Sequence, residues 1–240
     1  MARTRRVLIT CGLVLVGTAA RADGLWREDA PSKWPGTEAY RQKLREVLLG
    51  DKREPLCRLM TIPSSGPERA VFMVKKAGQV TAMSRMVKQS VWGQMMKELR
   101  KPGPDGRWRI DQGAMRASLE KMRVEVIARE ADLDADAAGT VSDLCREVLQ
   151  SAQPTPSNGG VGLDGVSYHA AHWQSGGLLT ARTWSPAKGT IAAEFVAVED
   201  TLRSFAEADE AARPKLRAAL VERSRRLRER LRTERHRKPR

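Results

Sequence analysis

"LCRLMTIPSSGPERAVFMVKKAGQVTAMSRMVK", residues 56–88, decides the fold class. Apolar and polar residues alternate here in three runs, 56–62, 69–76 and 79–88, and this period of two is typical of β-strands. The short connections "SSGPE" (64–68) and "AG" (77–78) are rich in turn residues. We therefore expect three antiparallel strands joined by hairpins.

The same period returns near the C-terminal half of the chain. The runs 166–173 and 178–184 flank "QSGG" and predict a second hairpin. A sixth strand is expected within 118–130, because the second half of that segment alternates. Residues 90–99 are compatible with either a further strand or a short helix.

Helical patterns occupy the rest of the chain. We predict helices over 37–49, 140–152 and about 190–208, and a last helix through 213–240. Thr140 and Asp143 stand as the N-cap and third residue of the second of these helices. The sequence therefore predicts an α+β fold, with an antiparallel sheet of about six strands, packed helices and a long basic C-terminal helix.

The first 22 residues have the pattern of a secretory signal peptide. Three arginines precede an apolar run over 7–19, and Ala20-Arg21-Ala22 offers the small-x-small pattern of a cleavage site. The run is shorter than the ~20 residues of a transmembrane helix, so an uncleaved anchor is the less favoured alternative. We predict a periplasmic or secreted chain with a cleaved signal peptide (1–22), an extended arm (23–36), an α+β domain (37–212) and an Arg-rich tail (213–240).

Cleavage would leave two cysteines, Cys57 and Cys145. An exported chain meets an oxidising compartment, which favours one disulfide between them. Two unpaired buried thiols are the alternative. A helix lying on a sheet would bring the two cysteines together, because Cys57 is expected on a strand and Cys145 on a helix.

The net positive charge belongs to the tail. Residues 213–240 hold 13 Lys or Arg side chains against three glutamates, whereas residues 23–212 hold 26 basic and 26 acidic side chains. The high isoelectric point therefore does not indicate a basic face on the domain.

The tail also carries a stripe of leucines on one side of a helix, Leu216, Leu220, Leu227 and Leu231. Three readings remain open. The helix could lie on an anionic membrane surface, it could bind another polyanion, or it could pack its leucines on the domain or on a second copy. Nucleic acid is not expected, because an exported protein rarely meets it and the tail has no aromatic residue for stacking. The residues predicted to bind an anionic surface are Arg223, Arg225, Arg226, Arg228, Arg230, Arg232 and Arg235.

A catalytic site is the rival hypothesis. His169, His172 and Asp164 lie close in sequence and could serve a small hydrolase or a metal-dependent enzyme. Residues three apart on a strand point to opposite faces, so the two histidines are not expected to act together. We favour a non-enzymatic protein.

Two further patterns are considered and set aside. The glycine-rich 159–165 lacks the Lys-Ser/Thr of a phosphate-binding loop, so no cofactor is expected. Four aspartates have the spacing of a calcium loop, but Ala137 stands where such a loop needs glycine. We interpret these acids as favouring the positive N-terminus of a following helix, and we predict no metal. The four are Asp132, Asp134, Asp136 and Asp143.

The stretch "GLDGVSYHAAHWQSGGLLTARTWSPAKGT", residues 162–190, resembles a group of exported bacterial proteins. They share an LDG-x-x-Tyr/Trp strand, a Trp-Ser-Pro strand end and a closing helix. The resemblance covers residues 162–208 best and extends loosely to the strands from Val71 onward. The group has no assigned activity, so the resemblance implies an exported α+β domain and nothing catalytic.

Together these features predict an exported binding or structural protein. Its Arg-rich tail is expected to contact an anionic envelope surface or an acidic partner through charge attraction.

Overall fold

The computed structural model describes residues 24–28, 37–50, 54–99, 101–102, 108–109, 112–155 and 165–237. The predicted signal peptide, most of the predicted arm and Asp164 lie outside these ranges.

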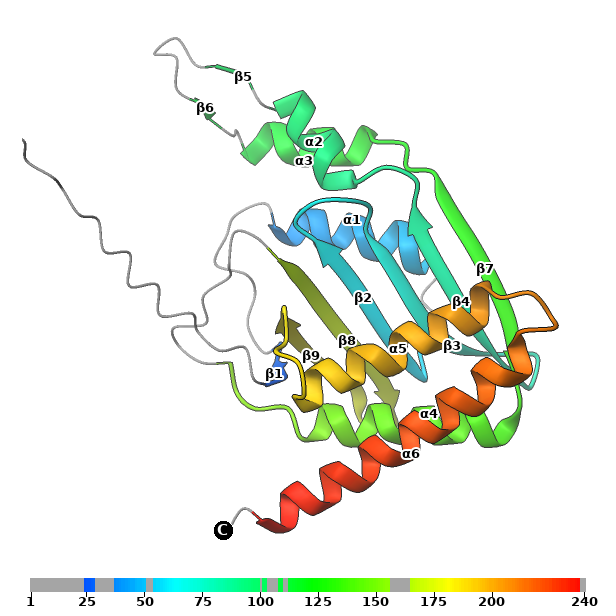
Figure 1. Ribbon diagram of the computed structural model, residues 1–240. Coiled ribbons are helices and arrows are strands. Elements are labelled where there is room, and N and C mark those ends of the chain that lie inside the picture. The colour runs from blue at the N-terminus through cyan, green and yellow to red at the C-terminus, as the bar shows by residue number, and fades with distance from the viewer. Residues whose placement is uncertain are drawn as a thin grey trace, which may run out of the picture.

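A seven-stranded antiparallel sheet forms the centre of the molecule (Figure 1). The α+β class is therefore confirmed, and the sheet has one strand more than the six expected because two residues of the predicted arm form an edge strand. A separate pair, β5 (Lys101–Pro102) and β6 (Trp108–Arg109), forms a small ribbon. In spatial order, the strands are β1 (Trp26–Arg27), β9 (Gly177–Trp184), β8 (Val166–Gln174), β2 (Cys57–Pro63), β3 (Arg69–Lys76), β4 (Gln79–Val87) and β7 (Val126–Leu133).

The predicted hairpins are present. Strands β2, β3 and β4 pair in sequence order, with Cys57 opposite Met73 and Val71 opposite Ser84. Strands β8 and β9 pair around the tight turn at 175–176. The N-terminal and C-terminal hairpins join through β2 and β8, where Met60 lies opposite His169.

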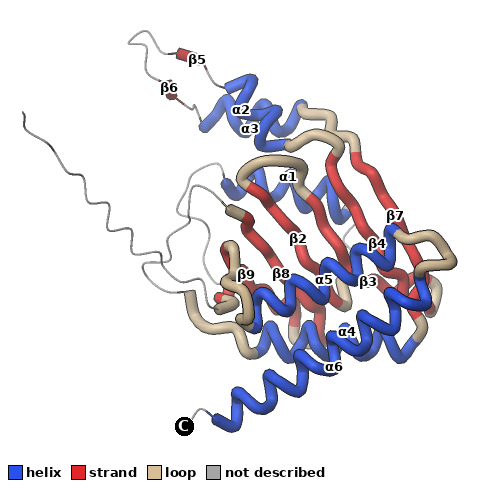
Figure 2. Tube along the Cα trace, in the orientation of Figure 1, coloured by secondary structure: helices blue, strands red, loops and turns tan. Residues whose placement is uncertain are grey.

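Helices cover both faces of the sheet (Figures 1 and 2). One face carries α4 (Ala135–Gln150), α5 (Ile191–Glu207) and α6 (Arg213–Arg237), and the other carries α1 (Thr37–Leu49), α2 (Val91–Leu99) and α3 (Gln112–Lys121). Each layer has its own buried cluster, because alternate strand residues point to opposite faces. Apolar burial at both faces is the main source of stability for such a three-layer arrangement.

A disulfide ties the α4 layer to the sheet. Cys57 of β2 and Cys145 of α4 are bonded, with their sulfurs 2.18 Å apart, and both residues are fully buried. The predicted pairing is confirmed, on a strand and a helix as expected.

The opposite layer is organised around a buried carboxylate. Glu68 accepts hydrogen bonds from Tyr40 Oη at 2.6 Å and from the backbone nitrogens of Val91 and Trp92 at 2.9 and 3.0 Å. It thereby satisfies the free N–H groups at the start of α2, which explains why residues 91–99 are helical.

One predicted strand is wrong in its first half. Residues 118–121 belong to α3, and β7 begins only at Val126. Met115, Leu119 and Met122 follow the helical spacing and are buried together against the α1 layer. Their burial requires a helix, so the alternating pattern holds only for the later residues.

The helix predicted from Thr140 begins five residues earlier. Its N-cap is Asp134, whose Oδ1 accepts a hydrogen bond from the backbone nitrogen of Ala137 at 2.9 Å. Asp is a better cap than Thr, and the alanines that follow it propagate the helix well. Gly139 is accommodated inside the helix.

The motif that carries the family resemblance closes the β8–β9 hairpin. Gly165 has a φ of +147°, and a Cβ there would lie 2.8 Å from the Trp184 ring. The backbone nitrogen of Val166 donates to Ser185 Oγ at 2.9 Å, and the Ser185 nitrogen donates to the Val166 carbonyl oxygen at the same distance. Gly165 and Ser185, which end one motif and belong to the other, thus meet at this corner.

Candidate functional site

Helix α6 packs on the domain. Leu220, Leu227 and Leu231 are buried in the same cluster as α4 and α5, and Leu216 packs against that cluster. The leucines of α6 therefore pack on the domain, as the third hypothesis for the tail expects. Figure 1 shows α6 lying along α4 and α5 on the outside of this layer.

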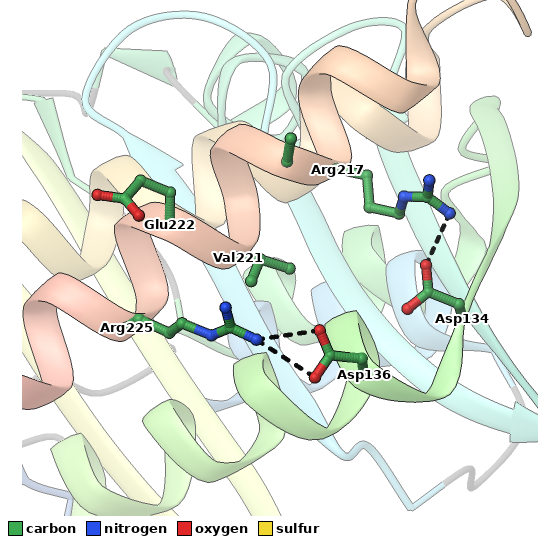
Figure 3. A pocket seen from close by; sticks show the side chains of 7 residues that line it. Asp134, Asp136, Arg217, Val221, Glu222 and Arg225 are labelled. Atoms are coloured by element: carbon green, nitrogen blue, oxygen red, sulfur yellow. Dashed lines mark hydrogen bonds and ion pairs between the residues drawn. The ribbon is translucent and has the colours of Figure 1, made fainter.

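An ion-paired seam runs between α6 and the acidic start of α4 (Figure 3). Arg217 Nη1 lies 2.7 Å from Asp134 Oδ2, and Arg225 Nη2 lies 3.1 Å from Asp136 Oδ2. Val221 and both pairs line an open hollow of about 510 Å³. Asp134 and Asp136 each already face an arginine, so neither offers unpaired charge to a ligand in this hollow.

The seam continues toward the C-terminal end of α4. Arg228 donates to Glu147 Oε1 from Nη2 at 2.6 Å and from Nε at 3.1 Å, and Asp143 Oδ2 lies 3.3 Å from Nη2. Arg232 approaches the same glutamate at 3.5 Å, and Arg235 donates to the Glu147 backbone oxygen at 2.9 Å. Three consecutive turns of α6 thus contact one residue, Glu147, two of them through its carboxylate and the third through its backbone oxygen.

These contacts lower the pKa values of two acids at α4. Burial alone would raise the pKa of Glu147, but the hydrogen bond and charge of Arg228, with Arg232, outweigh burial and lower the pKa. The pKa of Asp134 is lowered mainly by the hydrogen bond from the Ala137 backbone and further by Arg217. Both acids are therefore held as carboxylates by the seam.

The other flank of α6 faces α5. Arg230 pairs with Glu194 of α5 and donates from Nε to Glu234 Oε1 at 2.9 Å. This contact fixes α6 from the side opposite the seam.

The seven arginines predicted to bind an anionic surface therefore fall into two groups. Five of them contact acids or a carbonyl oxygen of the protein itself, namely Arg225, Arg228, Arg230, Arg232 and Arg235. Arg223 and Arg226 are exposed, as is Lys215, and none of these three has an ion pair within the described part of the chain. We call Lys215, Arg223 and Arg226 the outward cations.

The four aspartates with calcium-loop spacing lie in separate contacts. Asp132 accepts a hydrogen bond from Thr81 at 2.9 Å, Asp134 caps α4, and the other two face arginines of α6. Asp134 and Asp136 lie at the N-terminus of α4, where negative charge is favourable, as we interpreted them from the sequence.

The two histidines do not meet. Both are buried, and on strand β8 they project to opposite faces. His169 Nδ1 lies 3.1 Å from Glu28 Oε1, whereas His172 Nδ1 contacts the Leu56 backbone oxygen. Asp164, the third residue of the rival catalytic site, lies outside the described residues.

Basic side chains surround Glu28 on the α1 side of the sheet. Burial would raise its pKa, but the hydrogen bond with His169 and the charges of Arg41 and Arg182 lower it. Arg41 Nη1 lies 3.3 Å from Glu28. Nearby, burial and then repulsion from Arg45 lower the pKa of Arg58 to about 10. This cluster holds Glu28, the residue after β1, against the sheet.

One group of potential metal-ligating side chains converges in the described ranges. Cys57, Cys145 and Glu199 place their ligand atoms within 4.8 Å of one another, all buried. The two sulfurs are bonded to each other, so neither is a thiolate that could bind a metal.

Comparison with known proteins gives no relative: no protein-family model, no curated protein and no solved structure matches this chain. The resemblance of residues 162–208 to exported bacterial proteins therefore stays a prediction. Among the described helices, none combines the length and apolar character needed to cross a membrane.

The sequence analysis did not predict which acids pair with the arginines of α6. Asp136, Asp143 and Glu147 recur at i, i+7 and i+11, which places them on one face of α4. Arg217, Arg225, Arg228 and Arg232 follow a similar spacing on α6. Matching these two charged stripes would have predicted the seam.

Proposed function

We propose that this chain is an exported, non-enzymatic binding protein whose α6 docks an acidic protein partner through the outward cations. The observation that carries the proposal is the division of charge on α6. Arginines on both flanks of the helix are paired within the protein, while Lys215, Arg223 and Arg226 remain exposed and form no ion pair within the described chain.

An anionic lipid surface is the other ligand that this charge could attract. A surface-bound amphipathic helix gains much of its affinity by burying its apolar face in the lipid. Leu220, Leu227 and Leu231 are already buried in the protein, so this apolar stripe of α6 is not available for insertion into lipid. An acidic protein surface needs no apolar insertion, which favours it as the partner.

Export is supported by the Cys57–Cys145 disulfide, which suits an oxidising compartment. Catalysis at His169 and His172 is not proposed, because the sheet separates the two side chains.

The test uses the full chain and a fluorescent poly-glutamate peptide in an anisotropy titration across a salt series. The variant Lys215→Gln/Arg223→Gln/Arg226→Gln should bind the peptide about threefold to a hundredfold more weakly, since exposed ion pairs contribute ~0.2–1 kcal/mol each. Binding by the unaltered chain should weaken as salt rises.

A matched control removes three exposed cations elsewhere, Lys75, Lys121 and Arg123, which also lack an ion pair within the described ranges. This variant should bind as the unaltered chain does. Equal loss in both variants would mean that net charge alone attracts the peptide. Binding to phosphatidylglycerol vesicles with none to the peptide would instead identify lipid as the ligand, and the proposed protein partner would be wrong.

A further inference from the structure

Three elements bring the disulfide and a buried acid together. Cys57 comes from β2, Cys145 from α4 and Glu199 from α5, and all three residues have no exposed surface. An acid in such a place is costly when charged, because nothing replaces the water that it loses.

The acid touches the disulfide directly. Glu199 Oε1 lies 3.0 Å from Cys57 Sγ. A disulfide sulfur has no hydrogen, so the carboxyl group must supply the hydrogen of this contact, and Glu199 is the donor. Its Oε2 is buried with no hydrogen-bond partner in the described part of the structure. Burial, and then the charge of Asp200, raise the pKa of Glu199 to about 8.

The charged groups around this acid do not stabilise its ionised form. Asp200, the next residue, adds repulsion. Arg58 follows Cys57 but projects to the opposite face of the sheet, and Arg146 follows Cys145 but pairs at the surface with Asp143. On β8, the buried His172 uses Nδ1 to contact the Leu56 backbone oxygen. On α6, the nearest layer outside, the buried Ser224 is uncharged.

We propose that Cys57, Cys145 and Glu199 form a proton-coupled redox site that accepts electrons from a dithiol. The dithiol supplies two electrons and two protons, the bond between Cys57 Sγ and Cys145 Sγ breaks, both cysteines become thiols, and the dithiol closes to its own disulfide. Cys57 then carries an S–H group beside Glu199, whose Oε1 lies 3.0 Å from Sγ in the oxidised protein, and this donor is absent while the disulfide is intact.

This new donor changes the acid. A thiol hydrogen bond favours the carboxylate form, so Glu199 ionises more readily in the reduced protein than in the oxidised protein. The ionisation constant should rise by about tenfold or more, as for a hydrogen bond to a charged group. At a pH between the two pKa values, reduction therefore releases about half a proton from Glu199 for a tenfold change, and more for a larger one, while the two sulfurs take up two protons.

The proton count of reduction is the quantity to measure. The full chain is equilibrated with reduced and oxidised dithiothreitol at each pH, starting from both the oxidised and the reduced protein, and the thiols are counted by alkylation and mass spectrometry. Burial of the sulfurs slows the exchange, so agreement between the two starting states shows that equilibrium has been reached. The unaltered chain should take up about 1.5 protons or fewer per two electrons in a window just below pH 8, whereas Glu199→Gln should take up two in the same window.

Asp200→Asn is the matched control, because it keeps Glu199 but removes the neighbouring charge. It should retain the window of reduced proton uptake and move that window to lower pH. A second measurement, the infrared carboxyl band of the unaltered chain in both redox states, applies even if Glu199→Gln does not fold. Equal proton counts in the unaltered chain and Glu199→Gln, or an unchanged Glu199 pKa on reduction, would overturn the proposal.

This site is independent of the outward cations, so loss of peptide binding by α6 would leave it standing. Reduction would remove the covalent tie between β2 and α4, the helix that receives the arginines of α6.

Discussion

Arg228 of α6 and Glu147 of α4 form the least exposed ion pair of the α4–α6 seam. The exposed fractions of the two side chains are 20% and 13%, against 60% and 72% for Arg225 and Asp136. Two nitrogens of Arg228 donate to the same carboxylate oxygen. The Arg228–Glu147 pair is therefore largely shielded from solvent, whereas the Arg225–Asp136 pair is solvated. The two pairs should contribute unequally to stability.

Replacing Arg228 should cost more than replacing Arg225. Arg228→Gln leaves Glu147 half-buried with weaker partners, and we expect the free energy of unfolding to fall by about 1–3 kcal/mol. Arg225→Gln removes a solvated pair and should cost less than about 1 kcal/mol. Urea unfolding of the two variants measures the difference, and equal costs would contradict this account of the seam.

The contribution of Arg228 should depend on pH. The pKa of Glu147 is lowered in the folded protein, so the stability that the pair provides is present above the ordinary value of 4.5 and is lost as pH falls through the folded value. The gap in unfolding free energy between the unaltered chain and Arg228→Gln should therefore shrink from neutral pH to about pH 3. A gap that is constant over this range would exclude Glu147 as the partner that matters.

Helix α6 should behave as part of the core. Leu227 is 2% exposed and belongs to the cluster of α4 and α5. Leu227→Ala should lower the unfolding free energy by ~2–5 kcal/mol, measured by chemical denaturation. Ending the chain at Ala212 removes Leu220, Leu227 and Leu231 together and should prevent cooperative unfolding, whereas a stable, cooperatively folded product would show that α6 is dispensable.

Glu199 should give the protein a distinct pH profile while the disulfide is intact. Its pKa is raised from 4.5 to about 8 on folding, so its stabilising contribution is complete below pH 4.5 and is lost as pH rises to about 8. The free energy of unfolding of the unaltered chain, measured by thermal or urea denaturation, should thus fall across this interval relative to that of Glu199→Gln. Parallel profiles for the two proteins would mean that Glu199 ionises normally.

Much of the fold could be predicted from the sequence where one physical signal dominates. The alternation within 56–88 and the turns that separate its runs specify β2, β3 and β4, and the hairpin of β8 and β9 follows for the same reason. The helix over 37–49 was expected with the bounds it has. These segments are local, so their pattern needs no knowledge of the rest of the chain.

Other features depend on contacts between distant residues. Helix α3 could not be separated from the strand after it without knowing that Met115 and Met122 share a buried layer. The role of the tail arginines was likewise hidden, because their acids lie some 80 residues earlier, as for Arg228 and Glu147 at a separation of 81. Glu199 gave no sequence signal, since an acid on an amphipathic helix is usually exposed.

The central claim, that α6 presents Lys215, Arg223 and Arg226 to an acidic partner, is tested most directly by NMR of the isotope-labelled chain titrated with the poly-glutamate peptide. We expect the largest amide shift changes at and beside these three residues, with little change at Arg228 and Arg217, whose charges are already paired. Shift changes centred on another surface, or none at peptide concentrations that saturate binding in anisotropy, would contradict the claim.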